Sequence, residues 1–309
     1  MSVPFAFVGI VFIWSTTPLA IKWSGEEVGF LFGVAARMTI ALVVSLIVIA
    51  LIRKTLPLDK KSWHVYMAVG LPMYVAMLLC YWGAQFVPSG LVSVMFGLTP
   101  IFTGIAASFW LSEKSFSIFK IIGMLMSIAG LAFIFQESLD VESVAAIGLL
   151  GLLGATISHS LGTVWFKRVG NEMPAFTANT GGLGISVFLF SITWFFVGGG
   201  IPGSAPGYVV SSIVYLGVFG SVVGAFLFYY ALKRVKASTI GMLPLITPVS
   251  ALLIGQWFNA EVVSFQTLTG AAVILSGLMF YQLADDFVSK LCVSKTAGAP
   301  ELVISERIN

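Results

Sequence analysis

The sequence predicts an all-α integral membrane protein whose ten transmembrane helices form two inverted-topology five-helix repeats. Three observations lead to this fold class: long apolar windows, basic residues confined to one set of loops, and an internal repeat. Hydrophobic residues make up 58% of the 309 residues and charged residues only 9%, with a mean hydropathy of +1.02. Soluble domains carry about 25% charged residues on average, so the composition excludes a water-soluble fold.

Apolar windows of the length that crosses a bilayer, about 20 residues, follow one another along nearly the whole chain. The first window lacks a basic n-region and a small-residue cleavage site, so we expect it to be retained as a helix. The two cysteines, Cys80 and Cys292, indicate neither a disulfide framework nor a metal site. The expected spans are residues 3–23, 29–52, 64–86, 90–111, 118–136, 144–166, 176–197, 209–232, 238–259 and 265–284.

The basic residues indicate how the spans are oriented. If the N-terminus is cytoplasmic, every Lys and Arg except Lys22 and Arg37 falls at an inner loop, an inner helix end or the C-terminal tail. Acidic residues such as Glu26 and Asp140 then fall outside. This sidedness satisfies the positive-inside rule. We therefore expect a multi-pass protein of the plasma membrane, the inner membrane of a bacterium, with both termini cytoplasmic.

One pattern of residues occurs twice in the chain. Twelve residues separate Thr99-Pro100 from Glu113, and twelve residues separate Thr247-Pro248 from Glu261, 148 positions later. Tyr81 and Tyr229 share the same offset. Several matches in the same order indicate that one five-helix unit has been duplicated.

The duplication divides the chain into two inverted units. Five spans are an odd number, so the second copy must be upside down in the membrane. The loop charges agree, because the turn at residues 88–89 is uncharged whereas its counterpart, residues 233–236, reads "KRVK". We expect repeats at residues 1–142 and 143–285 and a polar, disordered cytoplasmic tail at residues 286–309. Inverted repeats are typical of transporters, whose substrate site lies at the midplane between the halves.

Residues near the centres of the matched spans are the candidates for a substrate site. Tyr81 and Tyr229 are favoured because they correspond across the repeat. His159 could titrate in the working pH range, or it could stay neutral, hydrogen-bonded between Ser158 and Ser160. The expected substrate-binding residues are Trp14, Ser15, Tyr74, Tyr81, Trp82, Phe96, Thr99, His159, Ser160, Trp165 and Tyr229.

Prolines and one charge stand out inside the spans. Pro18, Pro100 and Pro248 each free a main-chain carbonyl, so each is either a hinge or a fixed kink. Arg37 lies inside the second span, where a charge costs about 2.5–3.5 kcal/mol on insertion scales. Arg37 could bind a substrate carboxylate, or it could act as a staple for carbonyls freed by the prolines. The staple is supported by the lack of a matching basic residue in span seven. Glu113 and Glu261 are each expected to reach the start of the next helix or to pair with a neighbouring base.

Several segments carry a family resemblance. "FIWSTTPLAIK" at residues 12–22, an Arg early in span two, the "LTP…SEK" and "ITP…NAE" segments, and the "GMLMSIAG" and "GAAVILSG" helices resemble the EamA-type ten-helix members of the drug/metabolite transporter superfamily. The resemblance covers residues 3–285. It implies a central cavity lined by helices 1–4 and 6–9, peripheral helices 5 and 10, and export of small metabolites. The chain departs from the pattern at His159, where a tryptophan is expected.

The leading functional prediction is a transporter, most consistent with an exporter, of small neutral or zwitterionic metabolites such as amino acids or related aromatic compounds, acting by alternating access. A phosphate-bearing substrate is the alternative within the superfamily, although it calls for several intramembrane cations. A membrane-embedded enzyme would need clustered His, Cys or carboxylates, so we expect no catalytic residues, no metal and no cofactor. The expected partners are a small-molecule substrate and the lipid bilayer, without nucleic acid, and the oligomeric state stays open. No carboxylate lies mid-span, which predicts uniport or weakly proton-linked flux.

Overall fold

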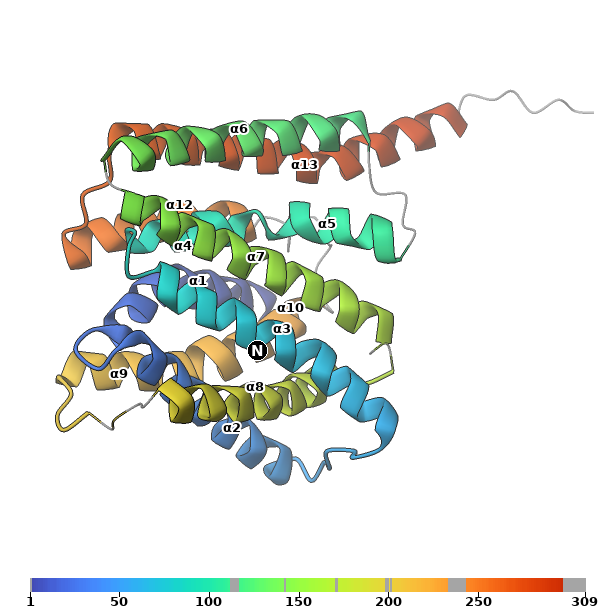
Figure 1. The fold of residues 1–309 in the computed structure, drawn as a ribbon. Helices are drawn as coiled ribbons and strands as arrows, with labels where there is room; N and C mark the ends of the chain where they lie inside the picture. Colours follow the sequence, from blue (N-terminus) through green and yellow to red (C-terminus); the bar gives the residue numbers. More distant parts are fainter. Residues whose placement is uncertain are drawn as a thin grey trace, which may run out of the picture.

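The computed structural model describes residues 2–111, 117–141, 143–169, 172–197, 200, 202–232 and 243–296. These parts of the chain form helices and contain no strand (Figure 1). The helices are α1 (Val3–Gly25), α2 (Phe30–Leu51), α3 (Lys60–Gly83), α4 (Ser89–Gly97), α5 (Thr99–Trp110), α6 (Ile118–Val141), α7 (Ser143–Val169), α8 (Ala175–Val197), α9 (Gly207–Tyr215), η1 (Leu216–Val223), α10 (Gly224–Leu232), α12 (Leu243–Asn259) and α13 (Phe265–Thr296).

Within the described residues, 8 helical stretches are long and apolar enough to cross a membrane. One of them joins α4 to α5, and another runs through α9 and η1 into α10. The membrane fold class is therefore confirmed, while the count of ten spans and their inverted arrangement stay predictions. The expected span at residues 238–259 begins outside the described residues and continues as α12.

Large apolar side chains point outward along the helices. On α1, Phe5, Val8 and Phe12 are each more than half exposed, and they share one face because they are spaced by three and four residues. Phe188 on α8 is exposed in the same way. A soluble monomer rarely carries apolar surface of this extent, so these faces are suited to contact lipid.

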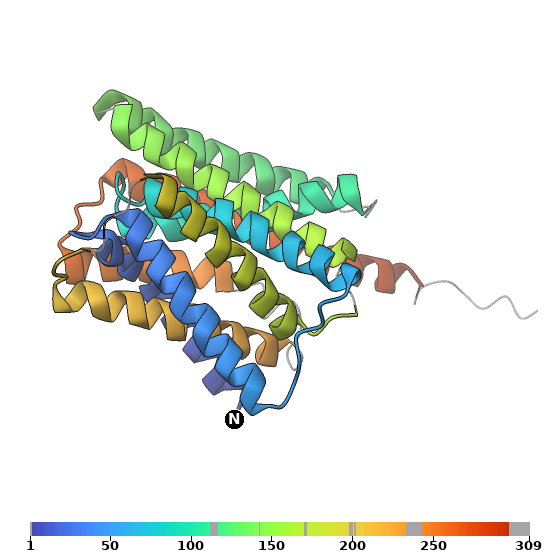
Figure 2. The ribbon, with the colours of Figure 1, turned by 60° about the horizontal axis from the view of Figure 1, so that its bottom comes forward.

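The bundle is layered (Figure 1). Helices α6 and α13 pack along one edge, and α2 and α8 pack along the opposite edge. Between them, α3 packs on α7 and α8, whereas α1 packs on α12, α10 and α9. Figure 2 shows the same bundle from another side, and in both views α13 extends past its neighbours at its C-terminal end. That helix runs to Thr296, beyond residue 285, where the sequence predicts the second repeat to end; residues 297–309 lie outside the description.

Glycines allow α6 and α13 to touch closely. A Cβ on Gly123 would overlap the carbonyl oxygen of Gly277, and a Cβ on Gly130 would overlap that of Gly270. Beyond Glu261 the second copy of the repeat is one residue shorter, so that Gly123 corresponds to Gly270 and Gly130 to Gly277. If each glycine is replaced by its counterpart in the other repeat, the Gly123–Gly277 contact becomes the Gly130–Gly270 contact.

The fourth expected span is broken rather than smoothly kinked. Helix α4 ends at Gly97 and α5 begins at Thr99, with Pro100 in the first turn of α5. The carbonyl of Phe96, which Pro100 cannot reach with an N–H, accepts the Thr99 hydroxyl at 2.6 Å. By contrast, Pro18 and Pro248 lie inside the continuous helices α1 and α12.

The expected eighth span contains a π-helix. Residues Leu216–Val223 form η1, flanked by α9 and α10. The Ser221 hydroxyl donates to the carbonyl of Leu216 at 3.0 Å, five residues back. The sequence predicts an ordinary α-helix here and does not reveal the π segment. Such segments are rare and concentrate at functional sites, so η1 is a candidate part of the functional site.

Candidate functional site

Arg37 is held inside the bundle by hydroxyl groups. Its side chain is on α2, and the residue is only 6% exposed. The Nε atom donates to the Ser221 Oγ of η1 at 3.4 Å, and Nη1 donates to the Tyr81 Oη of α3 at 3.4 Å. The guanidinium carbon lies 5.9 Å from the centroid of the Tyr81 ring, within the range of a cation–π contact.

Tyr81 connects this site to α1. The Ser24 hydroxyl donates to the Ile21 carbonyl at 2.8 Å and reaches the Tyr81 oxygen at 3.4 Å. Tyr81 itself is 1% exposed. Ser24, Arg37, Tyr81 and Ser221 form what we call the Arg37 cluster, in which α1, α2, α3 and η1 meet.

Aromatic and polar groups continue from this cluster along α1. The Thr16 hydroxyl lies 2.6 Å from the Tyr215 hydroxyl of α9. The Trp14 ring lies 5.4 Å from the Phe228 ring of α10. Ser15 is buried, and its hydroxyl has no partner among the described residues. Ser15 is thus inside the bundle and Trp14 is partly buried against α10, while their role in substrate binding stays a prediction.

His159, Ser160, Phe96 and Thr99 come together where α7 meets the α4–α5 break. The Ser160 hydroxyl donates to the Thr99 carbonyl at 3.3 Å, and the His159 ring is 6.0 Å from the Phe96 ring. His159 is exposed. Leu161, which is also exposed, lies about 200° from His159 around the helix axis. The two exposed side chains therefore lie on different faces of α7.

The other expected substrate-binding residues lie elsewhere. The Tyr74 hydroxyl is 2.6 Å from the Thr193 hydroxyl of α8. Trp82 packs on Phe86 and against Gly151 of α7. Trp165 is one turn from Leu161, on the same side of α7, and the side chain of Tyr229 is outside the described part of the structure.

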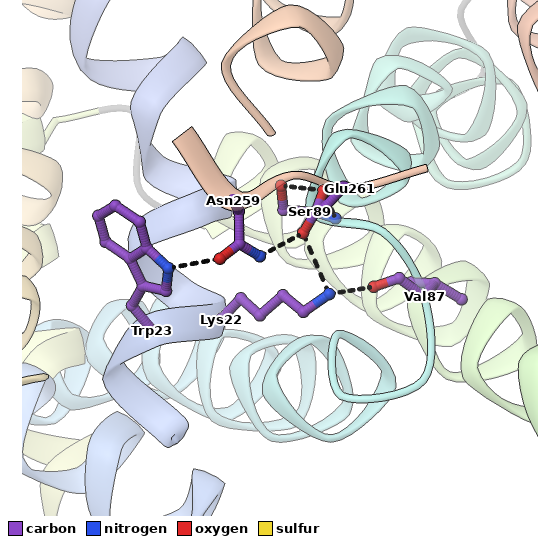
Figure 3. A network of polar contacts seen from close by, with 6 residues as sticks. All are labelled: Lys22, Trp23, Val87, Ser89, Asn259 and Glu261. Atoms are coloured by element: carbon purple, nitrogen blue, oxygen red, sulfur yellow. Dashed lines mark hydrogen bonds and ion pairs between the residues drawn. The ribbon is translucent and has the colours of Figure 1, made fainter. Parts of the chain in front are cut away.

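A second polar site, the Glu261 network, joins the ends of three segments (Figure 3). The Oε1 atom of Glu261 accepts from Lys22 Nζ at 3.0 Å and from Asn259 Nδ2 at 3.0 Å. Its Oε2 atom accepts from the Ser89 N–H and the Ser89 hydroxyl, both at 2.8 Å. Asn259 also accepts from Trp23 Nε1 at 2.9 Å. The network is formed by Lys22, Trp23, Val87, Ser89, Asn259 and Glu261.

The surroundings of Glu261 favour its ionised form. Burial alone would raise the pKa of this carboxyl, but the hydrogen bonds from Ser89 and Asn259 and the charge of Lys22 together lower it. Glu261 also lies at the N-terminus of α4, where the helix dipole stabilises an anion. The prediction that Glu261 pairs with a base is confirmed by Lys22. The helix start that its carboxylate reaches is that of α4 rather than that of the next helix in the chain, α13. Its repeat counterpart, Glu113, lies outside the described residues.

Three features of the sites escape sequence reasoning. Lys22 and Glu261 are 239 positions apart, so no local pattern pairs them. Ser24 and Ser221 look like ordinary packing residues, because small polar residues in such spans usually serve helix contact. The glycines of η1 are a weak signal for the π-helix, since glycine is frequent in membrane helices.

Helices long and apolar enough to cross a membrane, with large apolar side chains on their outer faces, are the architecture of a multi-pass membrane protein. A family model described as the EamA-like transporter family matches residues 1–136 and again residues 146–282. The chain belongs to this family, and it is a membrane transporter. The resemblance noted from the sequence motifs is thereby confirmed.

Similar proteins agree with this assignment. The chain is 25% identical over 281 residues to the uncharacterized transporter YoaV of Bacillus subtilis, covering 90% of this chain and 96% of that protein. It is 23% identical over 288 residues to protein PagO of Salmonella typhimurium, covering 92% and 94%. A solved structure titled "Crystal structure of protein" matches with a TM-score of 0.64 at 18% identity, over 92% of this chain and 98% of that one. This last likeness shows the fold alone.

Proposed function

We propose that the protein carries small neutral or zwitterionic metabolites, such as amino acids or related aromatic compounds, across the plasma membrane by alternating access. In this proposal two inverted five-helix halves rock about a substrate at the midplane, and the physiological direction is export. The loop charges support an orientation with both termini in the cytoplasm.

The glycine contacts support the inverted arrangement. The Gly123–Gly277 contact becomes the Gly130–Gly270 contact when the two repeats are exchanged. Two helices related by an axis in the membrane plane would give such a reciprocal pair. Inverted halves of this kind are a common basis for alternating access.

The observation that carries the proposal is the division of the fourth span. Helix α4 packs chiefly on α12 and to a smaller extent on α7, whereas α5 packs chiefly on α7. The break at Leu98 lies between these two segments. A helix whose halves are held by different partners can bend at the break when those partners move apart, and hinge motions are absorbed at such element ends.

The Glu261 network supports a closed state at one end of the bundle. It ties the last turn of α1 to the start of α4 and to the segment after α12. By the charge pattern, this end faces outside. Opening toward that side would require these contacts to break, while the break at Leu98 lets α5 move separately.

The side chains inside the bundle support a small, partly polar substrate. Trp14, Tyr81 and Phe96 offer aromatic surface, and Ser15 offers a hydroxyl. Within the described spans, Arg37 is the cation that is buried near these side chains. One cation suits a substrate with a single negative charge better than a phosphate, which calls for several cations.

Transport in proteoliposomes tests the proposal. Purified protein is reconstituted and uptake is measured for amino acids, nucleosides and aromatic amines, with protein-free liposomes as the blank. Trp257→Ala is the matched control, because Trp257 is exposed on the outside of α12. We expect saturable uptake of at least one amino acid or aromatic compound by the wild type and by this control. Failure of every compound to enter faster than in the blank would contradict the proposal.

A further inference from the structure

Arg37 is a buried cation that has no anionic partner among the described residues. The structure gives it hydroxyl partners, and the ion pair found among the described residues instead joins Lys22 to Glu261. Buried charges in membrane proteins are costly and are usually paired or functional. The side chains of the Arg37 cluster do not neutralise the charge of Arg37, so a further group is needed to explain why this charge is buried.

The staple interpretation is not what the contacts indicate. At the break, the Phe96 carbonyl accepts the Thr99 hydroxyl and the Thr99 carbonyl accepts the Ser160 hydroxyl. Short side chains thus serve these carbonyls, and in the described parts of the chain Arg37 donates to no main-chain oxygen.

The guanidinium is also incompletely bound. Both of its hydrogen bonds measure 3.4 Å, longer than the usual 2.9–3.0 Å of a good N–H···O bond. Its Nη2 atom makes no hydrogen bond within the described residues. A guanidinium has five N–H donors arranged to bind both oxygens of a carboxylate, so donors remain for a ligand.

Gly220 of η1 borders the Nη2 atom of Arg37. A Cβ on Gly220 would lie 3.6 Å from Nη2 and 3.8 Å from Thr17 Oγ1. Glycine at this position leaves that volume free of side chain. The Tyr81 hydroxyl accepts from Arg37, and its own proton faces the Ser24 hydroxyl, whose hydrogen goes to the Ile21 carbonyl.

We propose that the Arg37 cluster binds the carboxylate of the transported molecule. The guanidinium contacts both carboxylate oxygens, and the Tyr81 hydroxyl, which accepts from Nη1, holds the guanidinium in position. The substrates are then small organic acids, amino acids among them, and not amines without an acid group. This inference rests on the proposed transport function and narrows its substrate class.

Matched acids and amides test the inference in the purified, full-length protein. The probes are L-phenylalanine, L-leucine, L-lactate and benzoate, each compared with its amide, and binding is followed by the ligand-induced rise in melting temperature. We expect at least one acid to bind and its amide to bind about tenfold to a hundredfold more weakly, since hydrogen bonds to charged groups are worth that much. Equal binding of an acid and its amide would overturn the inference.

Variants assign the effect to the cluster. Arg37→Gln should abolish binding of the acid, Arg37→Lys should weaken it about tenfold because lysine lacks the planar fork, and Arg53→Gln, at the exposed end of α2, should leave it unchanged. Gly220→Ala, which fills the space beside Nη2 and suits a helix, and Tyr81→Phe should each weaken binding, and they carry the test if Arg37→Gln does not fold.

The failures of the two proposals differ. Wild-type binding of an acid by Arg37→Gln or Gly220→Ala, or transport of amines and nucleosides without binding of any acid, would overturn the carboxylate site and leave the transport function standing. If no compound of either panel is bound or transported, both proposals fail.

Discussion

The ammonium nitrogen of Lys22 lies 3.0 Å from a carboxylate oxygen of Glu261 and so joins the end of α1 to the segment after α12. The side chains are 25% and 6% exposed, respectively. Solvent screens a partly buried pair of this kind less than it screens a surface salt bridge, although removing the two groups from water offsets part of the gain. Because the pair joins α1 to the segment after α12, it would have to break if these two parts of the bundle moved apart.

Removing the charge of Glu261 should weaken the fold. Glu261→Gln keeps an oxygen for the Ser89 N–H but loses charge-assisted bonds, so we expect a loss of about 1–2 kcal/mol in stability. A double-mutant cycle with Lys22→Met should give a coupling energy of about 0.5–1 kcal/mol. Thermal unfolding of the purified variants measures both, with Lys54→Met, an exposed lysine, as the control. Additive losses in the cycle would show that the ion pair contributes nothing.

The Glu261 network should also make the thermal stability of the protein depend on pH in the acidic range. The pKa of Glu261 lies below its ordinary value of 4.5 in the folded protein, so its contribution is fully present above pH 4.5 and is lost as the pH falls through the folded pKa. The melting temperatures of the wild type and Glu261→Gln should differ by a constant amount from pH 7 to about pH 5 and converge below that. Asp59, whose pKa is lowered by hydrogen bonds to Ser62, affects both proteins equally. A difference that persists unchanged to pH 3 would be inconsistent with this assignment.

The two mid-span prolines should not be equivalent. Pro100 stands at the break between α4 and α5, whereas Pro248 lies inside continuous α12. Pro100→Ala restores an N–H that can rejoin the helix, so we expect slower transport without loss of stability. Pro248→Ala is the matched control and should change the rate less. Initial uptake rates in proteoliposomes decide the matter, and an equal or larger effect at Pro248 would mean that the break is not the hinge.

Proton coupling should be weak or should depend on His159. The spans as described contain no buried carboxylate at mid-depth, and His159 is exposed next to Phe96. We expect an imposed pH gradient to leave substrate levels near equilibrium, or any accumulation to vanish in His159→Gln. Substrate accumulation in proteoliposomes with and without the gradient is the measurement. Strong uphill accumulation that survives in His159→Gln would rule out both forms of the prediction.

The sequence is informative where chemistry is local. Apolar length predicts the spans, and the rule that proline frees a carbonyl predicts a disturbance at Pro100, which the structure places at a break. Charge preference predicts that Glu261 needs a base. Each of these inferences depends on residues a few positions apart.

The rest depends on contacts that only the fold creates. Tyr74, Tyr81 and Trp82 are close in the sequence, yet they contact α8, α2 and α7, respectively, because successive residues point in different directions around a helix. The π-helix at Leu216–Val223 has the apolar composition of an ordinary span. Periodicity could not distinguish it, and so could not predict that Ser221 meets Arg37.

The most direct test of alternating access is to lock the Glu261 network and measure transport. Cysteines replace Lys22 and Glu261 in a protein whose Cys80 and Cys292 are changed to serine, and a short, reducible thiol cross-linker joins them. The account predicts that cross-linking stops transport in proteoliposomes and that reduction restores it, while each single-cysteine variant is unaffected by the reagent. Undiminished transport by the cross-linked protein would contradict the claim that this end must open.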